Sequence, residues 1–77
     1  MERSKEEVAR TIEDFLNGRG DAWDWDDFTS IRIDDSELER IRWLCGSMRD
    51  IYPPEEPGDF CGPEGVAALR RILDGLR

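Results

Sequence analysis

Three stretches of the chain repeat apolar side chains at the spacing of a helix. Each stretch places such residues three or four positions apart, which gathers them on one helix face. The positions are Val8, Ile12, Phe15 and Leu16 in the first stretch, Leu38, Ile41, Cys45, Met48 and Tyr52 in the second, and Val66, Leu69, Ile72, Leu73 and Leu76 in the third. The pattern therefore predicts helices over residues 4–17, 35–51 and 63–75.

Residues typical of helix ends flank these stretches. Ser4 precedes Glu7 by three positions, the spacing of a capping box, and Gly18 can take the left-handed conformation that closes a helix. The Pro-Pro pair at 53–54 ends the second helix because proline has no amide donor, whereas Pro63 suits the first turn of the third helix. The start of the second helix can be capped by any one of three residues, Asp34, Asp35 and Ser36.

The stretch between the first two helices, residues 19–33, has no helical period. It contains Trp23, Trp25 and Phe28, which are too large and too apolar for a disordered linker. We expect an ordered loop with a short extended piece over 28–33. In this loop Trp25 and Phe28 point inward and the neighbouring carboxylates point outward, while the orientation of Trp23 stays open.

Three one-sided helices must bury their apolar faces against one another. We therefore expect a single all-α domain over residues 1–77, a compact three-helix fold with the aromatic and acidic loop packed across one side. Gly46, inside the second helix, marks a place where we expect another helix to approach closely.

No apolar run is long enough to cross a membrane, and the charged N-terminus is not followed by the apolar segment of a signal peptide. The expected location is the cytoplasm.

The chain is strongly acidic, with 19 acidic and 11 basic residues and a formal net charge of −8. Phosphate backbones and anionic membrane surfaces repel such a chain, which argues against nucleic acid and membrane partners and favours a basic protein partner. Seven of the acidic residues lie between positions 21 and 37, together with one basic residue, Arg32. A plainer explanation is that the excess acid keeps a small protein soluble.

Aromatic residues flanked by charge are typical of protein interfaces. Trp43 lies between Ile41 and Leu44, off the centre of the apolar face. It is either an exposed anchor or, in the interpretation we favour, part of the edge of the core. Asp26 and Asp27 have a structural alternative, as acceptors for loop amides. The candidate partner-binding residues are Asp21, Trp23, Asp24, Asp26, Asp27, Asp34, Asp35 and Trp43.

The residues offer no recognisable catalytic or metal-binding apparatus. The chain has no histidine, so Cys45 and Cys61 lack the usual base that activates a thiol, and two cysteines are too few for a structural zinc site. We expect both to be free thiols, with burial raising the pKa of Cys45. A calcium loop counted from Asp24 fails at Phe28, where an oxygen ligand is needed, and at Thr29, where glycine is needed. We expect no enzyme, no cofactor and no metal.

Several short motifs resemble those of small uncharacterised bacterial proteins with a Trp-Asp-Asp-Phe motif. The matching segments are Asp-Trp-Asp-Asp-Phe at 24–28, Leu-Glu-Arg-Ile-Arg at 38–42, Cys45, Tyr-Pro-Pro at 52–54 and Phe-Cys at 60–61. The resemblance implies a bacterial cytoplasmic domain. Some small acidic proteins of this kind look like immunity proteins, which neutralise toxins. That link depends on size and charge, and it assigns no functional residue.

The sequence thus leaves three functions open. The first is an interaction protein, such as an immunity or inhibitor protein that neutralises a basic partner. The second is a structural or metal-binding regulatory module without catalytic activity. The third is a very small enzyme, whose cleft would join the aspartates of residues 24–27 to Cys61 or Tyr52. A homodimer through the second or third helix is compatible with each, because a thin core gains from association.

Overall fold

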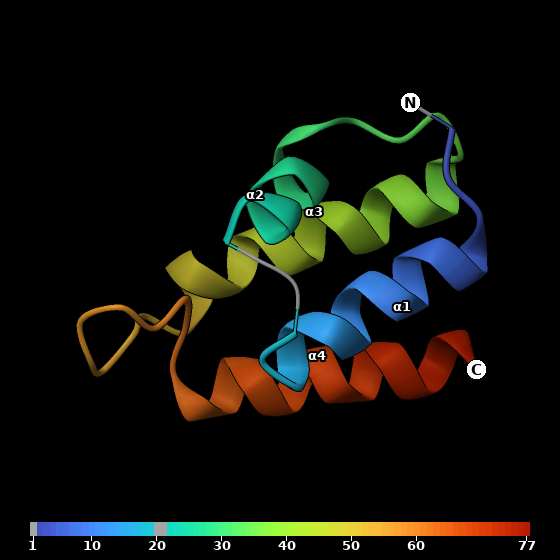
Figure 1. Cartoon of the computed structure of the whole chain (residues 1–77). Coiled ribbons are helices and arrows are strands. Elements are labelled where there is room, and N and C mark those ends of the chain that lie inside the picture. The colour runs from blue at the N-terminus through green and yellow to red at the C-terminus, as the bar shows by residue number, and fades with distance from the viewer. Residues whose placement is uncertain (1, 20–21) are drawn as a thin grey trace.

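Four helices make up the fold in the computed structural model, which describes residues 2–19 and 22–77, and their side chains except those of 22 and 23. Over the described residues the chain is all-helical, and α1 lies beside α4 while α2 lies against α3 (Figure 1). The Cα radius of gyration is 11.6 Å, and a compact chain of this length should have about 11.5 Å. The helices are α1 (Lys5–Leu16), α2 (Ala22–Ser30), α3 (Ser36–Ile51) and α4 (Pro63–Leu76).

The predicted helix ends are confirmed for three of the helices. At the start of α1, the Ser4 hydroxyl accepts from the Glu7 amide and the Glu7 carboxylate accepts from the Ser4 amide, each at 3.1 Å, which completes the capping box. Gly18 follows α1 with a φ of +70°, a conformation that glycine adopts at low cost. Asp35 caps α3, and Pro63 is the first residue of α4.

The predicted loop between the first two helices is wrong, because residues 22–30 form α2. The extended piece expected over 28–33 is also wrong, since its first three residues form the last turn of this helix. Trp25, Phe28 and Thr29 stand at i, i+3 and i+4, which places them on one side of a helix. That side faces the interior: Trp25 is 6% exposed and Phe28 is 0% exposed. The prediction that these two aromatic residues point inward is confirmed.

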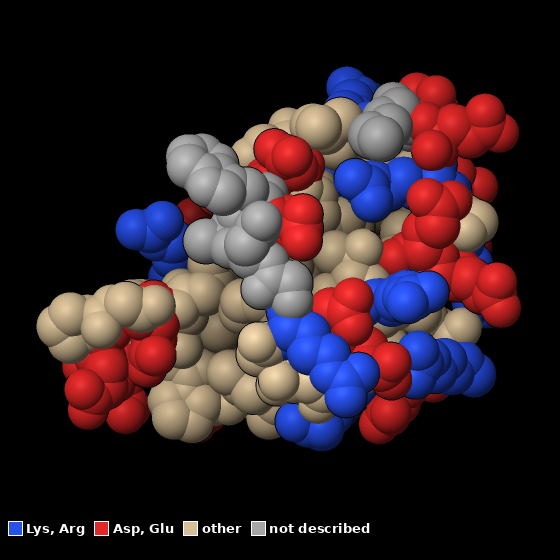
Figure 2. Space-filling model, in the orientation of Figure 1, with Lys and Arg blue, Asp and Glu red and all other residues tan. Residues whose placement is uncertain are grey.

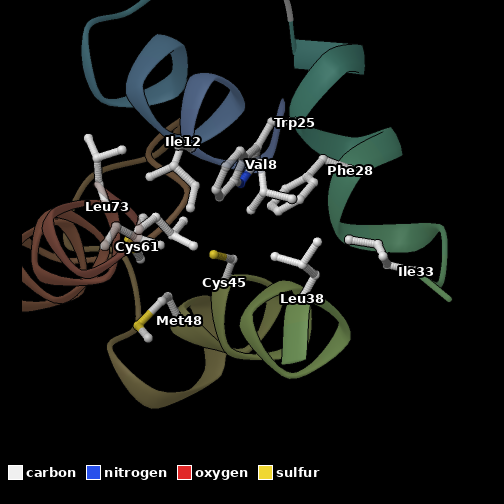
Figure 3. Packing of buried hydrophobic residues seen from close by; sticks show 13 residues of the cluster. Val8, Ile12, Trp25, Phe28, Ile33, Leu38, Cys45, Met48, Cys61 and Leu73 are labelled. Carbon is white, nitrogen blue, oxygen red and sulfur yellow. The ribbon is translucent and has the colours of Figure 1, made fainter. Parts of the chain in front are cut away.

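A cluster of four aromatic rings joins elements that are distant in the sequence. The ring of Trp25 stacks on Phe15 of α1 with the centroids 4.0 Å apart, and it meets the edge of Phe60, from the α3–α4 segment, at 5.6 Å. The Phe28 ring lies 5.4 Å from Trp25 on the other side. Figure 3 shows Trp25 and Phe28 reaching from α2 toward Val8, and the thiol of Cys45 facing the same interior. Trp25 and Phe28 of α2 therefore complete the core.

Two glycines lie where helices or segments come close. A Cβ on Gly46 of α3 would be 3.6 Å from the Thr29 Cβ of α2, which confirms the expected approach of another helix and leaves room for a methyl group. A Cβ on Gly65 of α4 would be 2.8 Å from the Cys61 Sγ and 3.3 Å from the Tyr52 Cβ. Only a residue without a side chain fits at Gly65 unless its neighbours move.

None of the helices over the described residues is long and apolar enough to span a membrane.

Candidate functional site

The carboxylates of α2 lie on the outside of the molecule. Asp24, Asp26 and Asp27 are exposed, because burying Trp25 and Phe28 turns the neighbouring positions of the helix outward. Asp24 and Asp27 also line a pocket of about 220 Å³ between α1 and α2. The other candidates near the start of α2 cannot be placed in the same way: Asp21 lies outside the described residues, as does the side chain of Trp23.

The pocket between α1 and α2 carries both signs of charge. Besides the two aspartates of α2, its lining includes Arg3, Arg19 and Asp14. The Arg3 guanidinium lies over the Phe28 ring, with its carbon 5.7 Å from the ring centroid, a distance at which a cation and an aromatic face attract. Asp24 and Asp27, which turn toward α1, are thus close to basic groups of this chain. Asp26 does not line this pocket.

Asp34 and Asp35 differ in what their side chains do. The Asp35 carboxylate accepts hydrogen bonds from the amides of Glu37 and Leu38, each at 3.0 Å, as the N-cap of α3. This carboxylate is committed to the fold, and its removal exposes amides that have no other partner within the helix. Asp34 is exposed in the connection between α2 and α3.

The expectation that Trp43 belongs to the edge of the core is wrong. Its side chain is 59% exposed, because it stands on the side of α3 away from Cys45 and Met48, which are buried. Trp43 lines an open pocket together with Arg32, Asp34 and other residues of the α2–α3 connection. The structure therefore brings Trp43 and Asp34 together, and it places them in a different pocket from that of Asp24 and Asp27.

An ion pair that sequence reasoning missed holds the α2–α3 connection in place. Arg42 donates to both carboxylate oxygens of Glu39, from Nε at 2.7 Å and from Nη2 at 2.6 Å. Its third donor, Nη1, reaches the backbone carbonyl of Thr29 at the end of α2. Glu39 also accepts from the amide of Ile33 at 2.9 Å. The hydrogen bonds from Arg42 and from Ile33 lower the pKa of Glu39 from 4.5 to about 2.

Both thiols are buried and are not arranged as nucleophiles. Burial raises the pKa of Cys45 from 9.0 to about 12, as the apolar stripe predicted. Burial, together with the nearby charge of Asp59, raises the pKa of Cys61 as well. A thiol reacts as its thiolate, so these shifts reduce reactivity. The structure also shows no group of three or more His, Cys, Asp or Glu residues placed to hold a metal ion, within the part of the chain that it describes.

The net negative charge comes from two segments of the chain. Residues 20–31 and 50–69 contain nine acidic residues and no Lys or Arg, whereas the rest of the chain has ten acidic and eleven basic residues. The first segment includes α2, and the second includes the connection from α3 to α4. The two segments touch through Trp25 and Phe60, whose ring centroids are 5.6 Å apart. Sequence reasoning found the first segment and missed the second.

Figure 2 shows acidic surface on the α3–α4 connection, which belongs to the second segment. The α3–α4 connection projects from the body of the molecule at the left of the view, where Figure 1 draws it in orange, and a patch of red covers its lower side. An uncharged surface adjoins this patch. Basic residues gather on the opposite, right-hand part of the same view, where they are mixed with acidic ones.

In comparisons with protein families, with curated proteins and with solved structures, no match to this chain was found.

Proposed function

We propose that this protein is a binding domain for another protein, whose contact surface is basic. The observation that carries the proposal is the separation of charge along the chain: two segments without Lys or Arg supply the net negative charge, and they meet through Trp25 and Phe60. Arg3 and Arg19 adjoin the first segment where it turns toward α1. Clustered charge of one sign attracts an oppositely charged partner over a Debye length and raises its rate of association. A mixed surface of the same net charge would do so less well.

The burial pattern supports binding over catalysis by a thiol. Cys45 and Cys61 are buried, and their pKa values are raised. A nucleophilic thiol, in contrast, is accessible and has a lowered pKa. The exposed groups include the carboxylates of the two acidic segments and the indole of Trp43, which suit recognition of a basic surface. An inhibitor that neutralises a basic protein, as an immunity protein neutralises a toxin, is the form of this function that we favour.

Affinity capture from an extract of the cells that make the protein tests this proposal. The immobilised chain should retain one basic protein in stoichiometric amount, and added salt should release it because exposed charges are screened. The variant Asp26→Asn/Asp27→Asn should retain less of it. Capture that yields no stoichiometric partner, or an acidic one that resists salt, would contradict the proposal.

A matched control separates a local effect from a change in total charge. Glu2→Gln/Glu6→Gln removes the same two charges from exposed positions at and before the first turn of α1, where basic residues are interspersed. This control should bind the partner nearly as well as the natural sequence. Trp43→Ala is a second probe: it leaves the charge unchanged, and lost binding would place the exposed side of α3 around Trp43 in the interface.

A further inference from the structure

An apolar groove runs between the end of α1, the α3–α4 connection and the start of α4. Half-buried apolar side chains from all three elements line it: Phe15 and Leu16 from α1, Phe60 from the connection and Val66 from α4. Its volume is about 530 Å³, within the range of roughly 300–1,000 Å³ that is usual for binding pockets. We call it the α1–α4 groove. None of the residues named so far as partner-binding candidates lines it.

Carboxylates edge the α1–α4 groove. Glu55, Glu56 and Asp59 of the α3–α4 connection contribute to its lining, and all three are exposed. Among the residues that the structure describes around the groove there is no Lys or Arg. Figure 2 shows the corresponding red patch on the projecting segment, next to uncharged surface. The groove therefore offers an apolar floor beside a negative wall.

The groove is built on fixed elements. The edge of Phe60 packs against Phe15 with the ring centroids 5.7 Å apart, and both rings contact Trp25 in the core. At the base of the connection, the amide of Gly62 donates to the carbonyl of Tyr52 at 2.8 Å. Because these contacts hold the floor and the base of the connection in place before anything binds, an occupant would not have to order them, and that ordering is a main cost of association.

We propose that the α1–α4 groove docks a basic amphipathic segment of the partner protein. Apolar side chains of that segment enter the groove between Phe15, Phe60 and Val66, and its Lys or Arg residues meet Glu55, Glu56 and Asp59. This proposal rests on the proposed function, because it names the part of the basic partner that is recognised. An apolar face bounded by cations is the complement of this surface, in the way that an amphipathic helix fits an apolar groove.

Other occupants fit the surface less well. An anionic lipid surface would be repelled by the carboxylates at the edge. A second copy of this chain also carries a net charge of −8, so self-association through an acidic edge works against electrostatic repulsion. A basic segment of another protein is attracted by the same carboxylates, and for that reason we commit to it.

The probe for this proposal is a fluorescein-labelled peptide that forms an amphipathic helix, with Leu at i, i+3, i+4 and i+7 and Lys or Arg on its other faces. Fluorescence anisotropy measures its affinity for the whole chain. The variant Glu55→Gln/Glu56→Gln/Asp59→Asn should weaken binding about tenfold, since three charge pairs at the rim of an interface are lost. Val66→Thr, which keeps the shape of the side chain and adds a polar group, should weaken it about fivefold.

Glu2→Gln/Glu6→Gln/Asp74→Asn is the matched control, because it removes three exposed carboxylates away from the α1–α4 groove. It should change the affinity less than about twofold. Circular dichroism checks that each variant is folded. Amide shifts in a ¹⁵N-labelled sample should move at residues 15–16 and 55–66 when the peptide is added. No binding to the natural sequence, equal weakening by the control, or shifts confined to other residues would overturn the proposal.

The same variants separate this proposal from the proposed function. If the groove variant captures the basic partner from the cell extract as well as the natural sequence does, the groove proposal fails while the proposed function stands. If no basic partner is captured, the proposed function fails. If sedimentation shows that the groove variant loses a dimer which the natural sequence forms, the groove is a contact between copies and the proposal is overturned.

Discussion

Replacing Gly65 by alanine tests the packing at the start of α4. The added methyl group would lie 2.8 Å from the Cys61 Sγ and 3.0 Å from the Cys61 Cβ, distances shorter than ordinary contact. Overpacking of this kind costs about 1–3 kcal/mol, whereas the better helix propensity of alanine returns at most about 1 kcal/mol. We therefore expect Gly65→Ala to lower the free energy of unfolding by up to about 2 kcal/mol.

Gly75 provides a control in the same helix. A Cβ at this position meets nothing within 4 Å, and the residue is exposed in the last turn of α4. Gly75→Ala should raise the free energy of unfolding by up to about 1 kcal/mol through propensity alone. Gly46→Ala should behave in the same direction, because its methyl group would make an ordinary contact of 3.6 Å with Thr29.

Urea denaturation followed by circular dichroism measures these changes, and thermal unfolding gives a second reading. For a domain of this size, each 1 kcal/mol corresponds to a shift in Tm of about 4–8 °C. Gly65→Ala should therefore shift the Tm in the opposite direction from Gly75→Ala and Gly46→Ala. If Gly65→Ala proves as stable as Gly75→Ala, the close approach of Cys61 and Tyr52 to α4 is not as the structure has it.

Two further predictions concern the α2–α3 side of the molecule. The pKa of Glu39 is lowered from 4.5 to about 2, so its carboxylate stabilises the fold fully above pH 4.5 and loses this effect as the pH falls toward 2. Glu39→Gln should therefore flatten the dependence of the urea midpoint on pH between these values. An unchanged slope would contradict the ion pair. Trp43→Ala should change the free energy of unfolding by less than about 0.5 kcal/mol, whereas Trp25→Ala should lower it by about 3–5 kcal/mol. Similar losses for both variants would contradict the exposure of Trp43.

The three long helices could be predicted from the sequence because their apolar residues repeat over several turns and recognisable caps flank them. The helix α2 could not. It has nine residues, and Trp, Asp, Phe, Thr and Ser are weak helix formers, so local propensity gives little indication of a helix. Burial of Trp25 and Phe28 supplies the stability, and a short helix depends on such packing rather than on its own hydrogen bonds.

The candidate site was predictable only in part, because the sequence shows which side chains are charged but not which way they point in the fold. The outward carboxylates of α2 follow from the inward aromatic residues. Trp43 was misplaced because its neighbours Ile41 and Leu44 are apolar, and sequence spacing alone does not show which flank of α3 another helix covers. The pair of Glu39 and Arg42 has the i, i+3 spacing of a helical ion pair, but its hydrogen bonds to Thr29 and Ile33 depend on the tertiary fold.

The same carboxylates that would attract a partner should weaken the free protein. Glu55, Glu56 and Asp59 are exposed around one groove that no Lys or Arg among the described residues lines, and like charges that folding brings together repel. Added salt should therefore raise the Tm, and Glu55→Gln/Glu56→Gln should raise it at low salt while weakening partner binding. Asp35→Ala should lower it instead, since this carboxylate caps α3 and a lost cap costs about 1 kcal/mol. If neutralising Glu55 and Glu56 destabilises the fold as removing Asp35 does, those two residues have a structural role and the acidic surface is not maintained for binding.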